Sequence, residues 1–66
     1  MKLTINGQAE SRAGTCSVAT LVAEMIAAQR GVAVAVNGTV VPRSTWSEVD
    51  LVDGDRIEVL TAAQGG

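Results

Sequence analysis

The residues with the clearest chemical potential are the last two of the chain, Gly65 and Gly66. Glycine has no Cβ, so its backbone can lie in a narrow channel at φ values that other residues avoid. The preceding residues 61–64 are small or polar and offer no large apolar side chain to bury. Such a tail is suited to carry a carboxylate into the active site of another protein. The alternative is a frayed chain end without chemistry, because termini are commonly disordered.

The composition of this 66-residue chain excludes most chemistry elsewhere. It has no histidine, one cysteine (Cys16) and one aromatic residue (Trp46), which excludes a metal cluster, a Cys/His pair and a disulfide framework within one chain. A net charge of −2 and the lack of aromatic stacking platforms argue against nucleic acid as a partner. We therefore expect one small domain that binds no metal or cofactor itself and whose chemistry needs a partner.

The apolar runs are short, and the start Met1-Lys2-Leu3-Thr4 lacks a signal-peptide pattern. A lone cysteine is compatible with a reducing compartment. We expect a cytoplasmic protein that does not enter a membrane.

The first half of the chain predicts a hairpin followed by a helix. Alternation over residues 2–5 indicates a half-buried strand, and residues 9–13 form a weaker return strand after the Asn6-Gly7 turn. Ser17 predicts the N-cap of an amphipathic helix over residues 18–30, with Gly31 as its C-cap. The residues expected to form its buried stripe are Val18, Leu21, Val22, Met25 and Ile26.

The second half predicts a hairpin and a final strand. Residues 32–36 are apolar throughout, which suggests a strand covered on both faces, and Asn37-Gly38 is a second turn. Pro42 ends the return strand 39–41 because it lacks a backbone donor. A short helical turn is expected over residues 44–49, and the last strand over residues 56–60.

This order of elements predicts the fold. A single helix cannot bury its stripe alone, so it must lie across one face of a mixed sheet. A right-handed crossover then places the first hairpin beside the last strand. This is the α+β layout of the β-grasp, or ubiquitin-like, architecture. We expect the domain to span residues 1–61 and a flexible tail to span residues 62–66.

Two segments resemble a known family. The first runs over residues 36–43, with its Val-Asn-Gly and Val-Pro-Arg sequences, to Trp46. The second runs from Leu51 through Asp-Gly-Asp and the last strand to the terminal Gly65-Gly66. Together they resemble the sulfur carrier protein of thiamine biosynthesis over nearly the whole chain. Residues 9–16 carry little of the family signature, and the tail sequence 61–64 is this chain's own.

The resemblance implies a thiocarboxylate at the C-terminus of Gly66. In such proteins a partner adenylyltransferase, an E1-like enzyme, uses MgATP to activate the terminal carboxylate. A cysteine persulfide then supplies sulfur, and thiazole synthase receives it for the thiazole ring. Gly66 would be the reacting residue and Gly65 would provide clearance, so the chain would be a protein cosubstrate and not an enzyme.

Three alternatives share some of these features. The small sulfur-carrying subunit of molybdopterin synthase has the same fold and Gly-Gly end. A ubiquitin-like protein modifier would form an amide between Gly66 and lysines of its targets. A plain interaction domain would have no chemistry at its tail.

Strand alternation also predicts a docking surface. If Val32, Val34 and Val36 face the helix, then Ala33 and Ala35 face outward, because successive side chains point to opposite faces. By the same alternation Leu60 points outward from the last strand. Ala33, Ala35 and Leu60 would form a small apolar patch suited to a partner. The alternative is ordinary scattered surface residues.

Four other residues have two interpretations each. Cys16 could be a sulfur-relay thiol at a helix start, but we interpret it as a small, partly buried apolar residue. Trp46 could contact a partner, but we interpret it as packing over the edge of the small core. Asp53 and Asp55 could ligate a metal, but two carboxylates flanking a glycine usually form a solvated turn.

Overall fold

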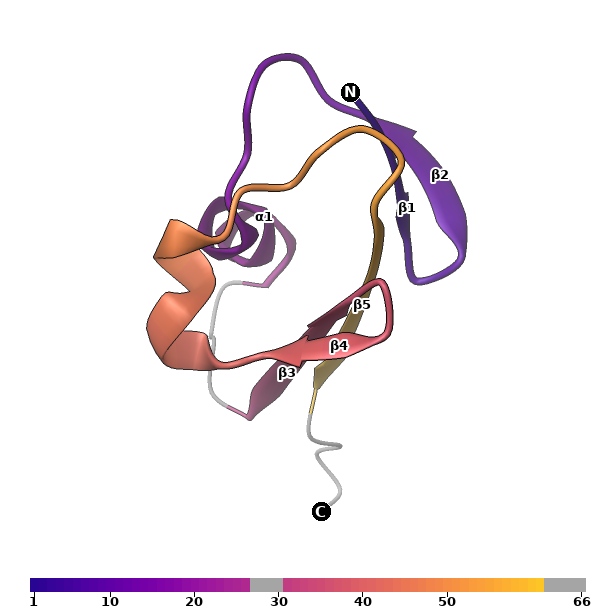
Figure 1. Ribbon diagram of the computed structural model, residues 1–66. Coiled ribbons are helices and arrows are strands. Elements are labelled where there is room, and N and C mark those ends of the chain that lie inside the picture. The colour runs from indigo at the N-terminus through magenta and orange to yellow at the C-terminus, as the bar shows by residue number, and fades with distance from the viewer. Residues whose placement is uncertain (27–30, 62–66) are drawn as a thin grey trace.

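The computed structural model describes residues 1–26 and 31–61. Figure 1 shows a mixed sheet with one helix across one of its faces. The elements, in chain order, are β1 (Lys2–Ile5), β2 (Gln8–Ser11), α1 (Val18–Met25), β3 (Val32–Val36), β4 (Thr39–Val41), the 3₁₀ helix η1 (Arg43–Glu48) and β5 (Arg56–Thr61). The predicted order of hairpin, helix, hairpin and strand is confirmed.

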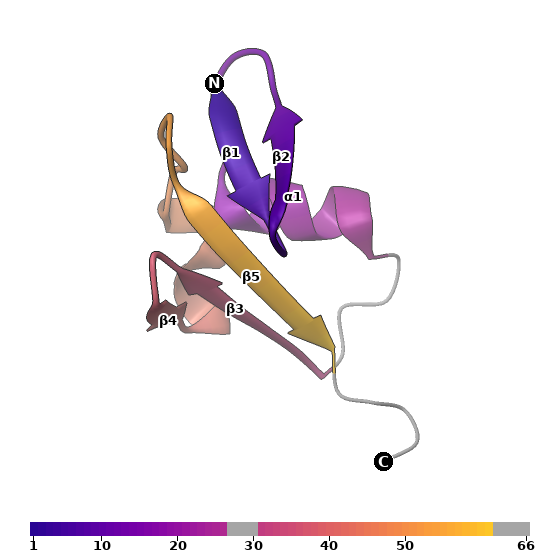
Figure 2. The ribbon, with the colours of Figure 1, turned by 90° about the vertical axis from the view of Figure 1, so that its right-hand side faces the viewer.

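The sheet has five strands in the order β2-β1-β5-β3-β4. Its first and last strands along the chain, β1 and β5, pair in parallel, with Ile5 opposite Ile57. On its other side β5 pairs antiparallel with β3, from Val32 opposite Thr61 to Val36 opposite Ile57. Figure 2 shows β5 running between these two neighbours, with α1 behind the sheet. The first hairpin and the last strand therefore lie together, as the sequence predicts.

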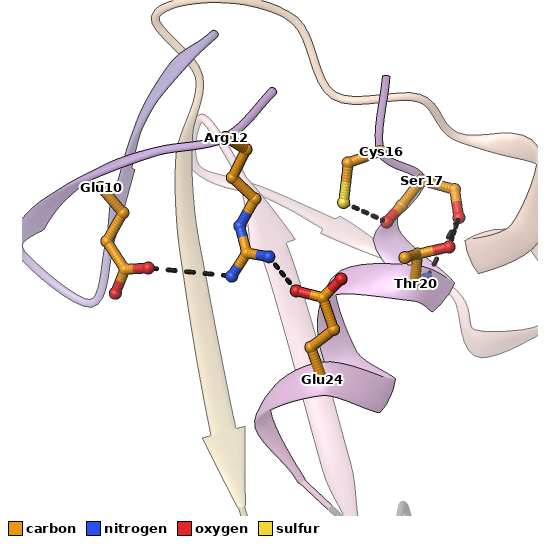
Figure 3. Close-up of polar contacts among 6 residues, drawn as sticks. All are labelled: Glu10, Arg12, Cys16, Ser17, Thr20 and Glu24. Carbon is orange, nitrogen blue, oxygen red and sulfur yellow. Dashed lines mark hydrogen bonds and ion pairs between the residues drawn. The ribbon is translucent and has the colours of Figure 1, made fainter. Parts of the chain in front are cut away.

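The helix starts where predicted but ends earlier. Its N-cap is Ser17, whose side-chain oxygen accepts a hydrogen bond of 3.1 Å from the backbone N–H of Thr20 (Figure 3). The last helical residue is Met25, and Ile26 is extended with φ −136° and ψ 124°. The prediction of one unbroken helix from the N-cap Ser17 to a C-cap at Gly31 is therefore wrong. β-branched residues such as Ile favour extended backbone, and Ile26 packs against the core from that conformation. Residues 27–30 lie outside the described residues.

The core lies between α1 and the inner face of the sheet. Its buried apolar residues are Leu3, Ile5, Cys16, Val18, Leu21, Val22, Val34, Trp46, Leu51, Ile57 and Val59. Trp46 reaches this core from η1 and donates its indole N–H to the carbonyl of Val41 at 2.9 Å. Packing of Trp46 on the core is confirmed, but at 3% exposure it is a buried member of the core and not a cover at its edge. The apolar spacing predicts Met25 in the buried stripe, but it is 39% exposed because it lies at the rim, at the last position of the helix.

Three further expectations need correction. β2 begins one residue earlier than predicted, ends at Ser11 and is exposed throughout, so it contributes pairing and no core. β3 is not covered on both faces, since Ala33 is exposed. Asp55 is not a solvated turn residue: it is 9% exposed and its carboxylate accepts hydrogen bonds from the Asn37 side chain and the Val52 N–H, both at 2.9 Å.

Replacing Leu21 by Ala is expected to lower the free energy of unfolding by about 2–5 kcal/mol, because the residue is fully buried and the change leaves a cavity. The matched control is Leu60→Ala, the same change at a side chain that is 65% exposed. We expect that control to cost less than about 0.5 kcal/mol. Equal losses for the two variants in urea titrations would show that the core is assigned incorrectly.

Candidate functional site

The outer face of the sheet, which is turned away from α1, carries the predicted docking residues. Ala33 of β3 lies directly opposite Leu60 of β5, and Ala35 lies opposite Glu58. On the other side of β3, Ala35 lies opposite Val40 of β4. Because directly opposite residues share a face of the sheet, all of these side chains project from one surface.

We call Ala33, Ala35, Val40 and Leu60 the outer-face patch. Leu60 and Val40 are its most exposed members, at 65% and 71%, while Ala33 is exposed and Ala35 is half-buried. The alternation predicted from the sequence is confirmed for β3 and β5. Alternate residues of β5 extend the same face with charge, through Glu58 and Arg56, both exposed. The patch is therefore apolar with one charged border.

Sequence reasoning missed Val40. The signal was present in the Asn37-Gly38 turn, because a two-residue turn sets the register of the two strands it joins. With Val36 opposite Thr39, Val40 must lie opposite Ala35 and share its face. A large apolar residue that is 71% exposed on an edge strand is the least expected member of the patch for an isolated domain.

The patch lies beside the last described residues of the chain. β5 ends at Thr61, one residue after Leu60. Gly65 and Gly66, the predicted clearance and reacting residues, lie outside the described residues. Gly66 follows Leu60 by six positions, and a chain of that length spans at most about 20 Å. A single partner can therefore cover the outer-face patch and reach the C-terminal carboxylate.

Cys16 lies in the core and not at the outer face. It is 6% exposed, and its Sγ donates to the carbonyl of Ser17 at 3.4 Å (Figure 3). The interpretation of Cys16 as a small apolar residue of the core is confirmed, and the residue is more deeply buried than expected. Figure 3 also shows Arg12 between Glu10 and Glu24, an ion-pair cluster that links the end of β2 to α1.

Replacing Cys16 by Ser is expected to leave sulfur acceptance at the C-terminus unchanged, because a thiol buried in the core cannot meet a partner's sulfur. The hydroxyl can donate to the same Ser17 carbonyl, so we expect a loss of stability of only about 1 kcal/mol. Cys16→Ala is the control that removes the polar atom. Intact-mass measurement of the sulfur-loaded chain checks both variants. A folded Cys16→Ser chain that no longer accepts sulfur would establish a relay role.

Within residues 1–26 and 31–61, no group of three or more His, Cys, Asp or Glu side chains is placed to hold a metal ion. In the same described part of the chain, no helix has the length and apolar character needed to cross a membrane.

A five-stranded mixed sheet with parallel first and last strands and one crossing helix defines a β-grasp protein, the ubiquitin-like class. Comparison with known families agrees with this class and identifies one family within it. The model of the ThiS family matches residues 3–66, a range that includes Gly65 and Gly66. The chain belongs to the ThiS family.

Two curated proteins are similar over the full length of the chain. The sulfur carrier protein ThiS of Escherichia coli (strain K12) is 33% identical over 66 residues, which is 100% of both chains. A thiazole synthase of Paramagnetospirillum magneticum (strain ATCC 700264 / AMB-1) is 36% identical over 66 residues. This chain spans only 20% of the length of that thiazole synthase.

Solved structures show the same fold. The crystal structure of a thiamine biosynthesis protein (ThiS) from Geobacter metallireducens matches with a TM-score of 0.82 and 33% identity, covering 100% of both chains. A solution NMR structure of a thiamine biosynthesis protein from the same organism matches with a TM-score of 0.83 and 33% identity, covering 88% of that chain. The predicted β-grasp fold is confirmed by these likenesses.

Proposed function

We propose that this chain carries sulfur for the thiazole ring in thiamine biosynthesis, with the carboxyl carbon of Gly66 as the reacting centre. The observation that carries the proposal is the ThiS family match, which extends through Gly66. The full-length likeness to a sulfur carrier protein from Escherichia coli supports it.

The chemistry explains why a carrier needs a partner enzyme. A free carboxylate is a poor electrophile, because its negative charge repels nucleophiles. Adenylation joins one carboxylate oxygen of Gly66 to the α-phosphorus of ATP and releases pyrophosphate, so that AMP becomes the leaving group. Attack by a sulfur nucleophile at the carboxyl carbon then expels AMP. Splitting one hard substitution into two easier ones is the logic of covalent activation.

In this proposal the chain is a cosubstrate and its partners supply catalysis. An E1-like adenylyltransferase would provide the MgATP site, where magnesium and basic groups neutralise phosphate charge. A cysteine persulfide would supply the sulfur: its outer sulfur attacks the carboxyl carbon and expels AMP. A thiol then attacks the inner sulfur of the resulting acyl disulfide, which leaves the thiocarboxylate on Gly66 and a disulfide as the oxidised product. Gly65 would give the tail clearance in the nucleotide channel, since glycine has no side chain to exclude. A cytoplasmic location, expected because the lone cysteine suits a reducing compartment, belongs to the proposal as well.

Thiazole synthase is the proposed acceptor of the sulfur. Supporting this is the relative named thiazole synthase, in which a segment similar to this whole chain makes up 20% of the protein. Joining a carrier and its acceptor in one polypeptide raises the effective concentration of each for the other. The outer-face patch is the proposed contact surface for both partners, which would then bind it in turn.

Reconstitution tests the proposal. The purified chain is incubated with a thiamine-pathway adenylyltransferase, MgATP, a persulfide donor and a thiol reductant that cleaves the acyl disulfide, and its intact mass is measured. We expect the mass gain that accompanies replacement of one carboxylate oxygen by sulfur, and transfer of that sulfur when thiazole synthase and its substrates are added. Transfer only to a molybdopterin precursor would identify the other carrier type. Conjugation to lysines through an amide would identify a protein modifier.

A further inference from the structure

A cluster of hydrogen bonds joins the β3–β4 turn to the start of β5. Asn37, the first residue of the turn, donates from its side-chain Nδ2 to Oδ1 of Asp55 at 2.9 Å. Its Oδ1 accepts from the backbone N–H of Arg56, also at 2.9 Å. Its backbone N–H donates to the Arg56 carbonyl at 2.7 Å. Both polar atoms of the Asn37 amide are therefore engaged by β5 and the residue before it.

Asp55 is the centre of this cluster. Among the described residues, Asp55 is the one polar residue that is buried, at 9% exposure. Its second carboxylate oxygen accepts a hydrogen bond from the Val52 N–H. Its carbonyl accepts from the N–H of Thr4 in β1 at 3.0 Å. The contact between Asn37 and Asp55 thus lies where three segments of the sheet meet.

The sequence Asn37-Gly38 is also prone to deamidation, a reaction that plays no part in the hydrogen bonds described above. In an Asn-Gly pair the backbone nitrogen of the glycine can attack the side-chain carbon of the asparagine, because glycine has no side chain to shield it. A bond forms between the Gly38 nitrogen and Cγ of Asn37, the C–N bond of the side-chain amide breaks, and ammonia leaves. Water then opens the resulting succinimide to aspartate or isoaspartate. No oxidant or reductant is needed.

We propose that Asn37-Gly38 is a deamidation site that the folded structure protects, and that its modification destabilises the sheet. Protection follows from the two hydrogen bonds that anchor the Asn37 amide to Asp55 and Arg56, because the side chain must release both before it can rotate freely. The turn must therefore open before ring closure, which needs close and aligned reacting atoms.

The deamidated product cannot restore the lost contact. Once the amide of Asn37 has become a carboxylate, an oxygen faces Asp55 in place of the NH₂ group. Two acceptors then face each other at a site where Asp55 is buried, with no hydrogen between them. Isoaspartate would in addition lengthen the backbone of a two-residue turn. Either product would loosen the start of β5.

Asn6-Gly7 provides an internal comparison. Asn6 also has a positive φ, 51° against 52° for Asn37. It too hydrogen-bonds to β5 through both polar atoms of its amide, but its partners are the N–H and the carbonyl of Val59, at 2.8 and 3.2 Å. Deamidation there would place a carboxylate against a neutral carbonyl and not against a second carboxylate. The two sites should be protected alike but differ in the consequence of modification.

The first experiment measures modification of the wild-type chain. Native and urea-unfolded samples are incubated at physiological pH and temperature, and peptide mass mapping follows the mass gain at each Asn-Gly pair. We expect deamidation of Asn37 to be at least about tenfold slower in the native sample, because it must wait for local opening. Equal rates in the two samples would overturn the protection that we propose.

The second experiment measures the consequence with defined variants. Asn37→Asp is expected to lower the folding equilibrium constant about 10- to 100-fold, the usual effect of leaving a buried charged group without its partner. Asn6→Asp should cost clearly less. The double variant N37D/D55N exchanges the carboxylate and the amide, so it should regain most of the stability that Asn37→Asp loses. Asp55→Asn alone should be less stable than the wild type, because it changes only one of the two partners. Asn37→Asp as stable as the wild type, or no recovery in the double variant, would overturn the proposed clash.

Discussion

Adding one residue after Gly66 is expected to abolish adenylation while leaving the fold and partner docking nearly unchanged. The added residue moves the carboxylate by up to about 3.5 Å, the length of one extended residue. In-line attack on the α-phosphate needs the reacting atoms at about 3–3.5 Å, so a displacement of this size removes the productive geometry. Deleting Gly66 should have the same effect by withdrawing the carboxylate. ATP–pyrophosphate exchange with the adenylating partner measures the loss.

The matched control for these variants is Gln64→Ala, which changes a tail side chain without changing the tail's length. It should retain exchange activity, because the proposed chemistry depends on the position of the carboxylate. Undiminished exchange by both the lengthened and the shortened chains would rule out the carrier mechanism. Loss of exchange in Gln64→Ala alone would show that the essential contact is made by the Gln64 side chain and not by the carboxylate.

The strands and the core were predictable because they depend on local periodicity. Alternation at residues 2–5 and 56–60, and the apolar spacing of Val18, Leu21 and Val22, each record which face of an element is buried. Those patterns depend only on residues close together in the sequence, so they can be recognised without knowing the fold. The same alternation correctly placed Ala33 and Leu60 on the outer face of the sheet.

What could not be predicted depends on contacts between distant residues. The Asn37–Asp55 hydrogen bond joins positions 18 apart, and neither residue type signals such a partner. Both residue types are typical of turns, which are usually solvated. The end of the helix at Met25 is similar, because the apolar spacing continues to Ile26 although Ile26 packs against the core from an extended backbone. In both cases tertiary packing overrides a local pattern.

The outer-face patch gives the second large expected effect. Leu60→Arg should weaken binding to the adenylyltransferase by about 30-fold or more, the size of effect found for an anchoring residue at the centre of an interface. Leu60 is 65% exposed, so the free chain accommodates the arginine in water. In the complex the guanidinium must lose water against apolar partner atoms, which is costly without a matching carboxylate. Titration calorimetry measures the affinity.

Val52→Arg is the matched control, because Val52 is also strongly exposed, at 60%, but lies in the loop before β5 and outside the patch. It introduces the same charge and should leave the affinity within about twofold, as expected for a surface substitution away from an interface. Val40→Arg should weaken binding like Leu60→Arg, because Val40 lies opposite Ala35 on the same face of the sheet. If Val40→Arg behaves like Val52→Arg while Leu60→Arg abolishes binding, the partner covers only the end of β5 near the tail. If all three variants bind like the wild type, the docking surface lies elsewhere and the exposure of Leu60 needs another explanation.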